Sequence, residues 1–115
     1  TLENIGERLR NYFQEHDVQR FALYGSGYVG QAFASLLNQN GIEFNNILDT
    51  YASGQERFNN HNIIKPDACN LGEYDSIIIT SSASEEIENN LINLEYGGQI
   101  VVLSDLIQLI ESTCL

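Results

Sequence analysis

The stretch that decides the fold is Arg20-Phe-Ala-Leu-Tyr-Gly-Ser-Gly-Tyr-Val-Gly30. Its first half is a short apolar run with the length of a buried strand, and it leads directly into glycines spaced as Gly25-x-Gly27-x-x-Gly30. After this turn the apolar spacing becomes helical, with side chains at Val29, Phe33, Leu36 and Leu37. The stretch therefore predicts a strand, a tight turn and a helix in immediate succession.

The same alternation of strands and helices continues along the chain. Four further strands are predicted at residues 44–48, 63–64, 76–80 and 99–103. Helices are predicted over residues 2–15, from Tyr28 to the Asn40-Gly41 stop, from a capping box at residues 82–85 to Gly97-Gly98, and after a cap at Ser104-Asp105. Residues 51–62 are expected to form a polar loop, and residues 67–72 a turn or short helix.

Strands that alternate with helices imply a parallel sheet with right-handed crossovers. We therefore expect a three-layer α/β domain with about five strands in the order 3-2-1-4-5. The topological switch point then lies between the first and fourth strands. The 115 residues fit one domain, divided into an N-terminal helix (1–16), a core (18–104) and a C-terminal helix (105–115).

This length is too short for a complete two-half dinucleotide fold with a separate substrate domain. The chain contains no Met and begins at Thr1, which fits an excerpt from a larger protein as well as a chain that has lost its initiator. Cys69 and Cys114 lie outside any C-x-x-C pair, so reduced thiols are expected, although the sequence leaves their redox state open.

Charge excludes two classes of partner. Sixteen acidic residues against five basic ones give a formal net charge of -11, which argues against nucleic acid and anionic membranes. The sequence has no apolar run of membrane-spanning length and no basic-then-apolar leader. We therefore expect a cytoplasmic protein without direct membrane contact.

The glycine turn meets the contextual tests for a dinucleotide-binding fingerprint. It follows a predicted strand, opens a predicted helix, and is followed by Asp49 at the end of the next strand, 19 positions after Gly30. Gly25 permits the turn, Gly27 lets a pyrophosphate approach the backbone, and Gly30 lets the helix pack closely. The alternative is that the glycines only shape the turn, with Asp49 as a surface residue.

A ligand at this turn would be held mainly by the backbone. The N–H groups at the start of the helix can bind phosphate without Lys or Arg. Asp49 can accept hydrogen bonds from both ribose hydroxyls, which favours NAD(H) over NADP(H) because a 2′-phosphate would be repelled. The candidate cofactor-binding residues are Gly25, Ser26, Gly27, Tyr28, Val29, Gly30, Asp49, Thr50, Ser81 and Ser82.

The sequence lacks the residues that other cofactor-binding and catalytic motifs require. Lys65, the only lysine, lies far from a glycine loop, so a P-loop is absent, and the glycine spacing disfavours S-adenosylmethionine. No tyrosine has a lysine four positions on, and no catalytic triad or metal-binding set is evident. His16 and His61 are predicted to be surface residues. Ser82 is explained more simply by helix capping than by ligand contact, and Glu85, Glu86 and Glu88 by a solvated face.

Four segments together resemble a known type of module: residues 21–32, 47–49, 63–66 and 74–82. Across residues 18–104 the chain is similar to small Rossmann modules attached to bacterial nucleotide-sugar dehydratases, sugar acyltransferases and sugar methyltransferases. This resemblance implies that Gly25, Gly27, Gly30 and Asp49 bind a nucleotide cofactor or nucleotide sugar. It also implies that catalysis belongs to a neighbouring domain. No base-recognition role can be assigned to residues 51–62.

The leading hypothesis is a non-catalytic module that binds NAD(H) or a nucleotide sugar, beside a catalytic domain or partner protein. One alternative is a ligand-free interaction domain whose first helix packs on a partner. Another is the cofactor half of an NAD-dependent oxidoreductase. Homo-oligomerisation remains open.

Overall fold

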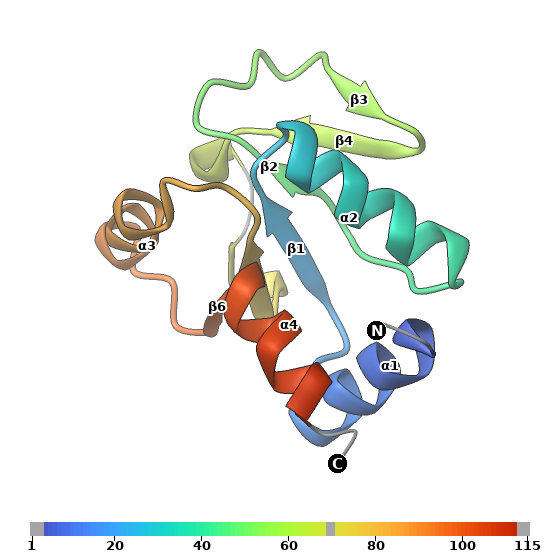
Figure 1. Cartoon of the computed structure of the whole chain (residues 1–115). Helices are drawn as coiled ribbons and strands as arrows, with labels where there is room; N and C mark the ends of the chain where they lie inside the picture. The colour runs from blue at the N-terminus through green and yellow to red at the C-terminus, as the bar shows by residue number, and fades with distance from the viewer. Residues whose placement is uncertain (1–3, 69–70, 113–115) are drawn as a thin grey trace.

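A six-stranded sheet forms the centre of the computed structural model, which describes residues 4–68 and 71–112. Its order is β3-β4-β2-β1-β5-β6 (Figure 1). The parallel strands are β1 (Phe21–Tyr24), β2 (Ile47–Leu48), β4 (His61–Ile64), β5 (Ser76–Ile79) and β6 (Gln99–Val102). They correspond to the five predicted strands, and their predicted order 3-2-1-4-5 is confirmed.

The sixth strand, β3 (Arg57–Phe58), lies where a polar loop was predicted. It pairs antiparallel with β4 at the edge of the sheet, and Asn59 turns the chain between them with a φ of 56°. The prediction of a loop was wrong because the hairpin is short and largely polar, so it has no clear apolar alternation. An asparagine in this left-handed conformation is a common turn signal.

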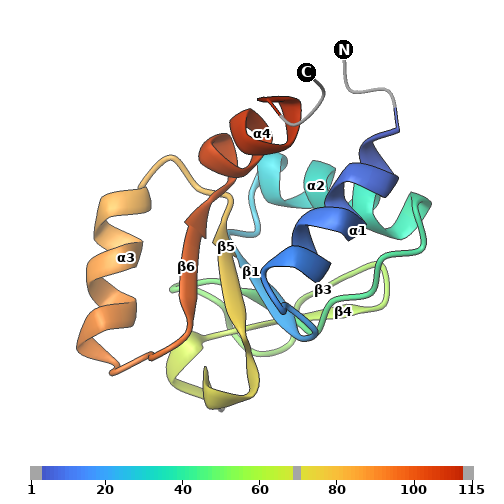
Figure 2. The same cartoon turned by 90° about the horizontal axis from the view of Figure 1, so that it is seen from below.

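Helices cover both faces of the sheet, as a three-layer domain requires. Figure 2 shows α3 (Ser84–Asn93) on the opposite face from α1 (Ile5–Glu15), α2 (Tyr28–Gln39) and α4 (Leu103–Ser112). Two separate groups of buried apolar side chains fill the two interfaces. Short 3₁₀ helices, η1 (Pro66–Ala68) and η2 (Leu71–Glu73), lead into β5.

The N-terminal helix is part of the domain. Its Leu9 is fully buried, and Tyr12 and Phe13 are nearly so, in the same core as residues of α2 and α4. The Arg10 guanidinium donates to the backbone carbonyl of Asn40 at the end of α2. The apolar face that suggested docking on a partner is therefore used inside the fold.

Three helix boundaries differ from their predictions. Ser82 does not cap α3, because Ala83 is the N-cap and makes no side-chain cap hydrogen bond. The same helix ends at Asn93 rather than at the glycine pair, and Glu95 adopts the left-handed conformation there with a φ of 62°. Ser104 and Asp105 lie inside α4, which begins at Leu103 directly after β6.

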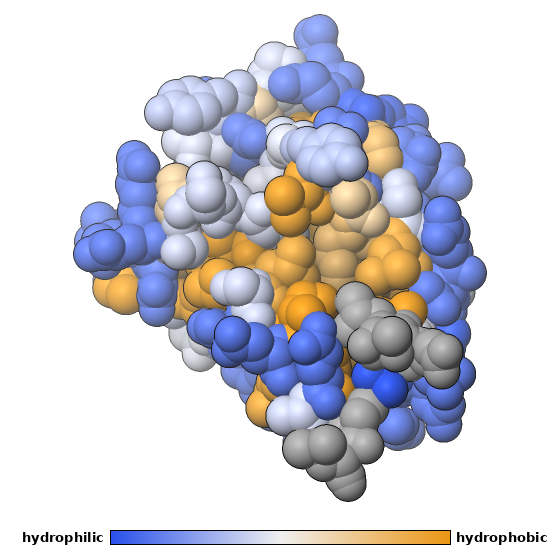
Figure 3. Space-filling model, in the orientation of Figure 1, coloured by the Kyte–Doolittle hydropathy of each residue, from blue (hydrophilic) through white to orange (hydrophobic). Residues whose placement is uncertain are grey.

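One face of the molecule has a hydrophobic centre (Figure 3). Figure 3 shows hydrophobic residues near the centre of one face and hydrophilic residues around its edge. None of the helices within residues 4–68 and 71–112 is long and apolar enough to span a bilayer. Cys69 and Cys114 lie outside the described residues.

The two ends of the central strand β5 carry contrasting hydroxyl groups. All four residues of the strand are buried, as the sequence predicted. Within the described chain, the Ser76 hydroxyl is buried without a hydrogen-bond partner. Just past the other end, Thr80 Oγ1 lies 3.2 Å from the carbonyl oxygen of Tyr24 and 3.0 Å from that of Gly25, and it can donate to either. The first hydroxyl destabilises the fold, and the second supports the glycine turn.

Paired substitutions test this contrast. We expect Ser76→Ala to leave the free energy of unfolding unchanged or to raise it by up to about 1 kcal/mol, because it removes an unsatisfied buried hydroxyl. The matched variant Thr80→Val should lower the free energy of unfolding by about 1–2 kcal/mol, because the Gly25 carbonyl oxygen loses the hydroxyl donor, whereas the Tyr24 carbonyl oxygen keeps the Thr80 N–H. Urea unfolding measures both. A clear loss in Ser76→Ala would show that this hydroxyl has a stabilising partner.

Candidate functional site

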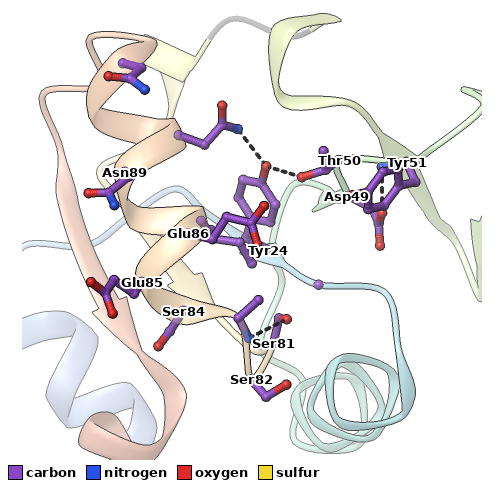
Figure 4. Close-up of a pocket in the computed structure, with 15 residues that line it drawn as sticks. Tyr24, Asp49, Thr50, Tyr51, Ser81, Ser82, Ser84, Glu85, Glu86 and Asn89 are labelled. Atoms are coloured by element: carbon purple, nitrogen blue, oxygen red, sulfur yellow. Dashed lines mark hydrogen bonds between the residues drawn. The ribbon is translucent and has the colours of Figure 1, made fainter.

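The candidate site is a cavity of about 920 Å³ at the carboxyl ends of β1, β2 and β5. It lies between the segment that follows β2 and the helix α3 (Figure 4). This is the position where open α/β sheets bind ligands, beside the predicted switch point. The cavity is lined by Tyr24, Gly25, Asp49, Thr50, Tyr51, Ser81, Ser82, Ala83, Ser84, Glu85, Glu86, Ile87, Asn89, Asn90 and Asn93.

The geometry favours glycine at each of the three positions of the turn for a different reason. Gly25 has a φ of +134°, and a Cβ there would also lie 2.6 Å from Thr80 Oγ1. A Cβ on Gly30 would collide with the carbonyl oxygen of Gly25, so α2 can pack against the turn only with glycine at this position. A Cβ on Gly27 would meet nothing within 4 Å, which leaves open space above the backbone.

The first turn of α2 offers unpaired backbone donors. Gly27 is its N-cap, with no side-chain cap hydrogen bond, and the first turn contains no acidic residue. The N–H groups at the start of a helix have no intrahelical partners, and the helix dipole adds a partial positive charge. Helix α3 differs, because Glu85 and Glu86 already occupy its first turn. The two helix termini near the cavity are therefore electrostatically unequal.

Asp49 connects the end of β2 to the glycine turn. Its Oδ2 accepts from the Ser26 hydroxyl at 2.5 Å and from the Ser26 N–H at 3.3 Å, and its Oδ1 accepts from the Tyr51 N–H at 2.9 Å. Burial alone would raise the pKa of Asp49, but these hydrogen bonds outweigh burial and hold the pKa below its ordinary value. The carboxylate is therefore charged and fixed in position at neutral pH.

A hydrogen-bonded chain crosses the floor of the cavity. The Tyr24 hydroxyl lies 2.8 Å from Thr50 Oγ1 and accepts from Asn90 Nδ2 at 3.0 Å (Figure 4). This one phenol links the segment after β2 to α3. Sequence reasoning missed Tyr24 and Asn90, although a tyrosine at the last position of a buried strand is a usable signal, since its hydroxyl needs a partner.

The structure separates the candidate residues into groups. Five of them line the cavity: Gly25, Asp49, Thr50, Ser81 and Ser82. Ser26 contacts Asp49. The other four, Gly27, Tyr28, Val29 and Gly30, lie outside the cavity lining, and the side chains of Tyr28 and Val29 have exposures of 89% and 50%. Ser81 Oγ accepts from the Ala83 N–H at 3.1 Å, so it shapes the entry to α3.

The face of α3 toward the cavity is the main omission of the sequence analysis. Glu85 and Glu86 were interpreted as part of a solvated face, and both are exposed, but they also line the cavity together with three asparagines of the same helix. The lining residues include three carboxylates and no Lys, Arg or His. A phosphate group at this site would therefore depend on backbone N–H groups.

The histidines lie away from this cavity. His16 is exposed, as expected, and stacks on Tyr12. His61, also predicted to be a surface residue, is partly exposed, and its ring stacks on Phe44 with a centroid distance of 3.8 Å. Burial lowers the pKa of His61, although a hydrogen bond with the Asn45 backbone acts in the opposite direction. No group of three potential metal ligands occurs among the described residues.

The pH dependence of folding tests the Asp49 contacts. We expect Asp49→Asn to lower the free energy of unfolding at neutral pH by about 1 kcal/mol, because the charged acceptor of the Ser26 donors is lost. The folded pKa is depressed, so the contribution of the carboxylate is complete above the unfolded pKa and disappears as the pH falls through the folded pKa.

Urea unfolding of both proteins from neutral to strongly acidic pH measures this difference. The wild type and Asp49→Asn should converge in acid, whereas the exposed control Glu88→Gln should stay close to the wild type at neutral pH. A difference that remains constant across the whole range would show that the charge of Asp49 does not stabilise the fold.

Comparison with solved structures supports the fold. A repressor of the Rex family, RSP, matches with a TM-score of 0.54 and 16% identity over 98% of this chain and 72% of its own. The same protein in complex with β-NADH matches with a TM-score of 0.52 and 14% identity, over 94% of this chain and 66% of its own. Similarity at this level of identity establishes a Rossmann-like fold.

The comparisons leave two predictions without support. RSP is a repressor rather than a sugar-metabolising enzyme, so attachment to such an enzyme stays a prediction. The charge-based expectation that the chain avoids nucleic acid also gains no support from similarity to a repressor. No curated protein matches the sequence. Residues 17–102 match the model of a defined family, and the chain therefore belongs to the family described as C2185-like, N-terminal.

Proposed function

We propose that the chain is a nucleotide-binding module that takes NAD(H) in the cavity beside the glycine turn. The observation that carries the proposal is the pairing of open space above Gly27 with a fixed, charged Asp49 at the end of the neighbouring strand. In this proposal the module itself is not catalytic. It serves a larger protein, in which a neighbouring domain or partner performs the chemistry.

The phosphates lie at the first turn of α2 in this proposal. That turn has free N–H groups and no acidic side chain, whereas Glu85 and Glu86 would repel a phosphate at the first turn of α3. The absence of a side chain at Gly27 lets the phosphate approach these N–H groups. The site therefore binds an anion in spite of the net charge of -11.

The ribose hydroxyls donate to Asp49. A carboxylate has about four acceptor positions, and three protein hydrogen bonds already use part of this capacity. One ribose hydroxyl can therefore bind directly. The second ribose hydroxyl replaces the Ser26 hydroxyl as a donor to the carboxylate. The Ser26 side chain can rotate away, and the Ser26 N–H still holds the carboxylate in place.

Similarity to known proteins supports the proposal at a coarse level. RSP binds β-NADH, and it shares the fold of this chain at 14% identity. The family description names an N-terminal domain, which fits a module within a larger protein. Attachment to a cytoplasmic bacterial enzyme of sugar-nucleotide metabolism, inferred from the resemblance, is the more specific form of the proposal.

Binding of NAD⁺ and NADH to Gly27→Val tests the proposed site. We expect at least about a tenfold loss of affinity, because the new side chain fills the space of the phosphate. The loss in folding stability should stay within about 1 kcal/mol, since the backbone of Gly27 is extended and its surroundings are open. Isothermal titration calorimetry and thermal unfolding provide the two measurements.

Gly97→Val is the matched control, because Gly97 also lies in open space but near the amino end of β6, away from the cavity. It should bind like the wild type. The ligand panel includes NAD⁺, NADH, AMP and UDP-glucose. If none of them binds the wild type at millimolar concentration, the proposal fails and the ligand-free interaction domain becomes the better explanation.

Discrimination between NAD⁺ and NADP⁺ tests the role of Asp49. The 2′-phosphate would face the carboxylate, so we expect NADP⁺ to bind at least about tenfold more weakly than NAD⁺. Asp49→Asn should weaken NAD⁺ binding and reduce this preference, because the repulsive charge is gone. Calorimetry at two salt concentrations checks that the preference for NAD⁺ is electrostatic, since screening by salt should also reduce the difference in affinity between NAD⁺ and NADP⁺. If the wild type binds NAD⁺ and NADP⁺ with equal affinity, the ribose does not lie on Asp49.

A further inference from the structure

We propose that the cavity selects adenine over bases without an exocyclic amine, with Glu86 of α3 as the residue that recognises this amine. The inference rests on the proposed function, because it takes the ribose of the nucleotide to lie on Asp49. It assigns a specificity-determining role to a side chain that sequence analysis placed on a solvated face.

The floor of the cavity fixes where α3 lies relative to the ribose position. Asn90 donates to the Tyr24 hydroxyl at 3.0 Å, and this hydroxyl lies 2.8 Å from Thr50 Oγ1. Thr50 directly follows Asp49. Two hydrogen bonds through the Tyr24 hydroxyl therefore link Thr50, the neighbour of the proposed ribose acceptor, to Asn90 in α3.

Glu86 lies on the same face of α3 as Asn90. The two residues are four positions apart in a helix, so their side chains are neighbours one turn from each other. In the view of Figure 4 the Glu86 side chain overlaps the Tyr24 ring, and both residues line the cavity. Among the residues that the structure describes, none forms a hydrogen bond or ion pair with the Glu86 carboxylate.

The ligand geometry directs the base toward this carboxylate. With the phosphates at α2 and the ribose on Asp49, the remaining part of the cavity lies between Tyr51 and the cavity-facing residues of α3. The exposed ring of Tyr51 and the α3 side chains then form the two walls around the base. Glu86 is the charged group of α3 next to the Tyr24 and Asn90 side chains in the floor.

A carboxylate accepts hydrogen bonds and donates none, so it favours a ligand that presents an N–H group. Adenine presents its N6 amine. Hypoxanthine carries a carbonyl oxygen at the position of the amine and its N–H on the neighbouring ring atom N1, and uracil carries carbonyl oxygens on both sides of its single ring N–H. An oxygen facing Glu86 would leave two acceptors in contact, which costs affinity. The cavity should therefore prefer NAD(H) to a uridine nucleotide sugar.

Nicotinamide hypoxanthine dinucleotide provides the sharpest probe, because it differs from NAD⁺ only at one edge of the base, where an oxygen replaces the N6 amine and N1 carries a proton. Calorimetry should give at least about a tenfold preference of the wild type for NAD⁺. Glu86→Gln should reduce this preference to about threefold or less, or reverse it, because its amide can donate to the hypoxanthine oxygen. Glu88→Gln makes the same change on α3 outside the cavity lining and should keep the wild-type preference.

The outcomes separate the inference from the proposed function. Equal affinities of the wild type for the two dinucleotides would overturn base selection while leaving dinucleotide binding intact. A wild-type preference that survives in Glu86→Gln would overturn the role of Glu86. Failure of both dinucleotides to bind the folded wild type would overturn the proposed function and this inference with it.

Discussion

The carbonyl oxygen of Gly25 is the point on which the rest of the site depends. A side chain on Gly30 would collide with it, so the absence of that side chain lets α2 pack against the turn. Thr80 Oγ1 lies 3.0 Å from the same oxygen and connects it to the end of β5. The first strand, the helix after it and the end of the neighbouring strand thus meet at one backbone group. The position of the helix N-terminus, and so of its free N–H groups, follows from this contact.

Charge divides the site into an anion-binding half and an anion-excluding half. The first turn of α2 has no acidic residue, whereas the cavity wall carries Asp49, Glu85 and Glu86 without a compensating cation among its lining residues. Backbone dipoles act over short distances, and carboxylates repel phosphate over longer ones. Under the proposed function, a nucleotide would therefore have one favourable orientation, with its phosphates at the turn and its hydroxyl and amine groups toward the acids.

The sequence contained enough information for the centre of the fold and less for its surroundings. The β1–turn–α2 unit was predictable because glycine spacing, strand length and helical period all agree at residues 20–40. Strand β3 was missed because two residues of a polar hairpin carry no periodic signal. The helix boundaries at Ser82 and Ser104 were misplaced because tight connections start both helices without the predicted caps.

The ligand-facing side of α3 could not be predicted from the sequence for a different reason. Its rotation about its own axis depends on how Ile87 and Leu91 pack on the sheet, and only this packing turns Glu86 and Asn90 toward the cavity. The Tyr24 hydroxyl then links Asn90 to Thr50 on the opposite wall, so the spacing of the walls rests on this hydrogen-bonded chain rather than on Glu86. Residues that maintain the cavity and residues that would read the ligand are thus separate side chains. A wall residue can change without disturbing the floor, which is one physical reason why a single fold can serve many different ligands.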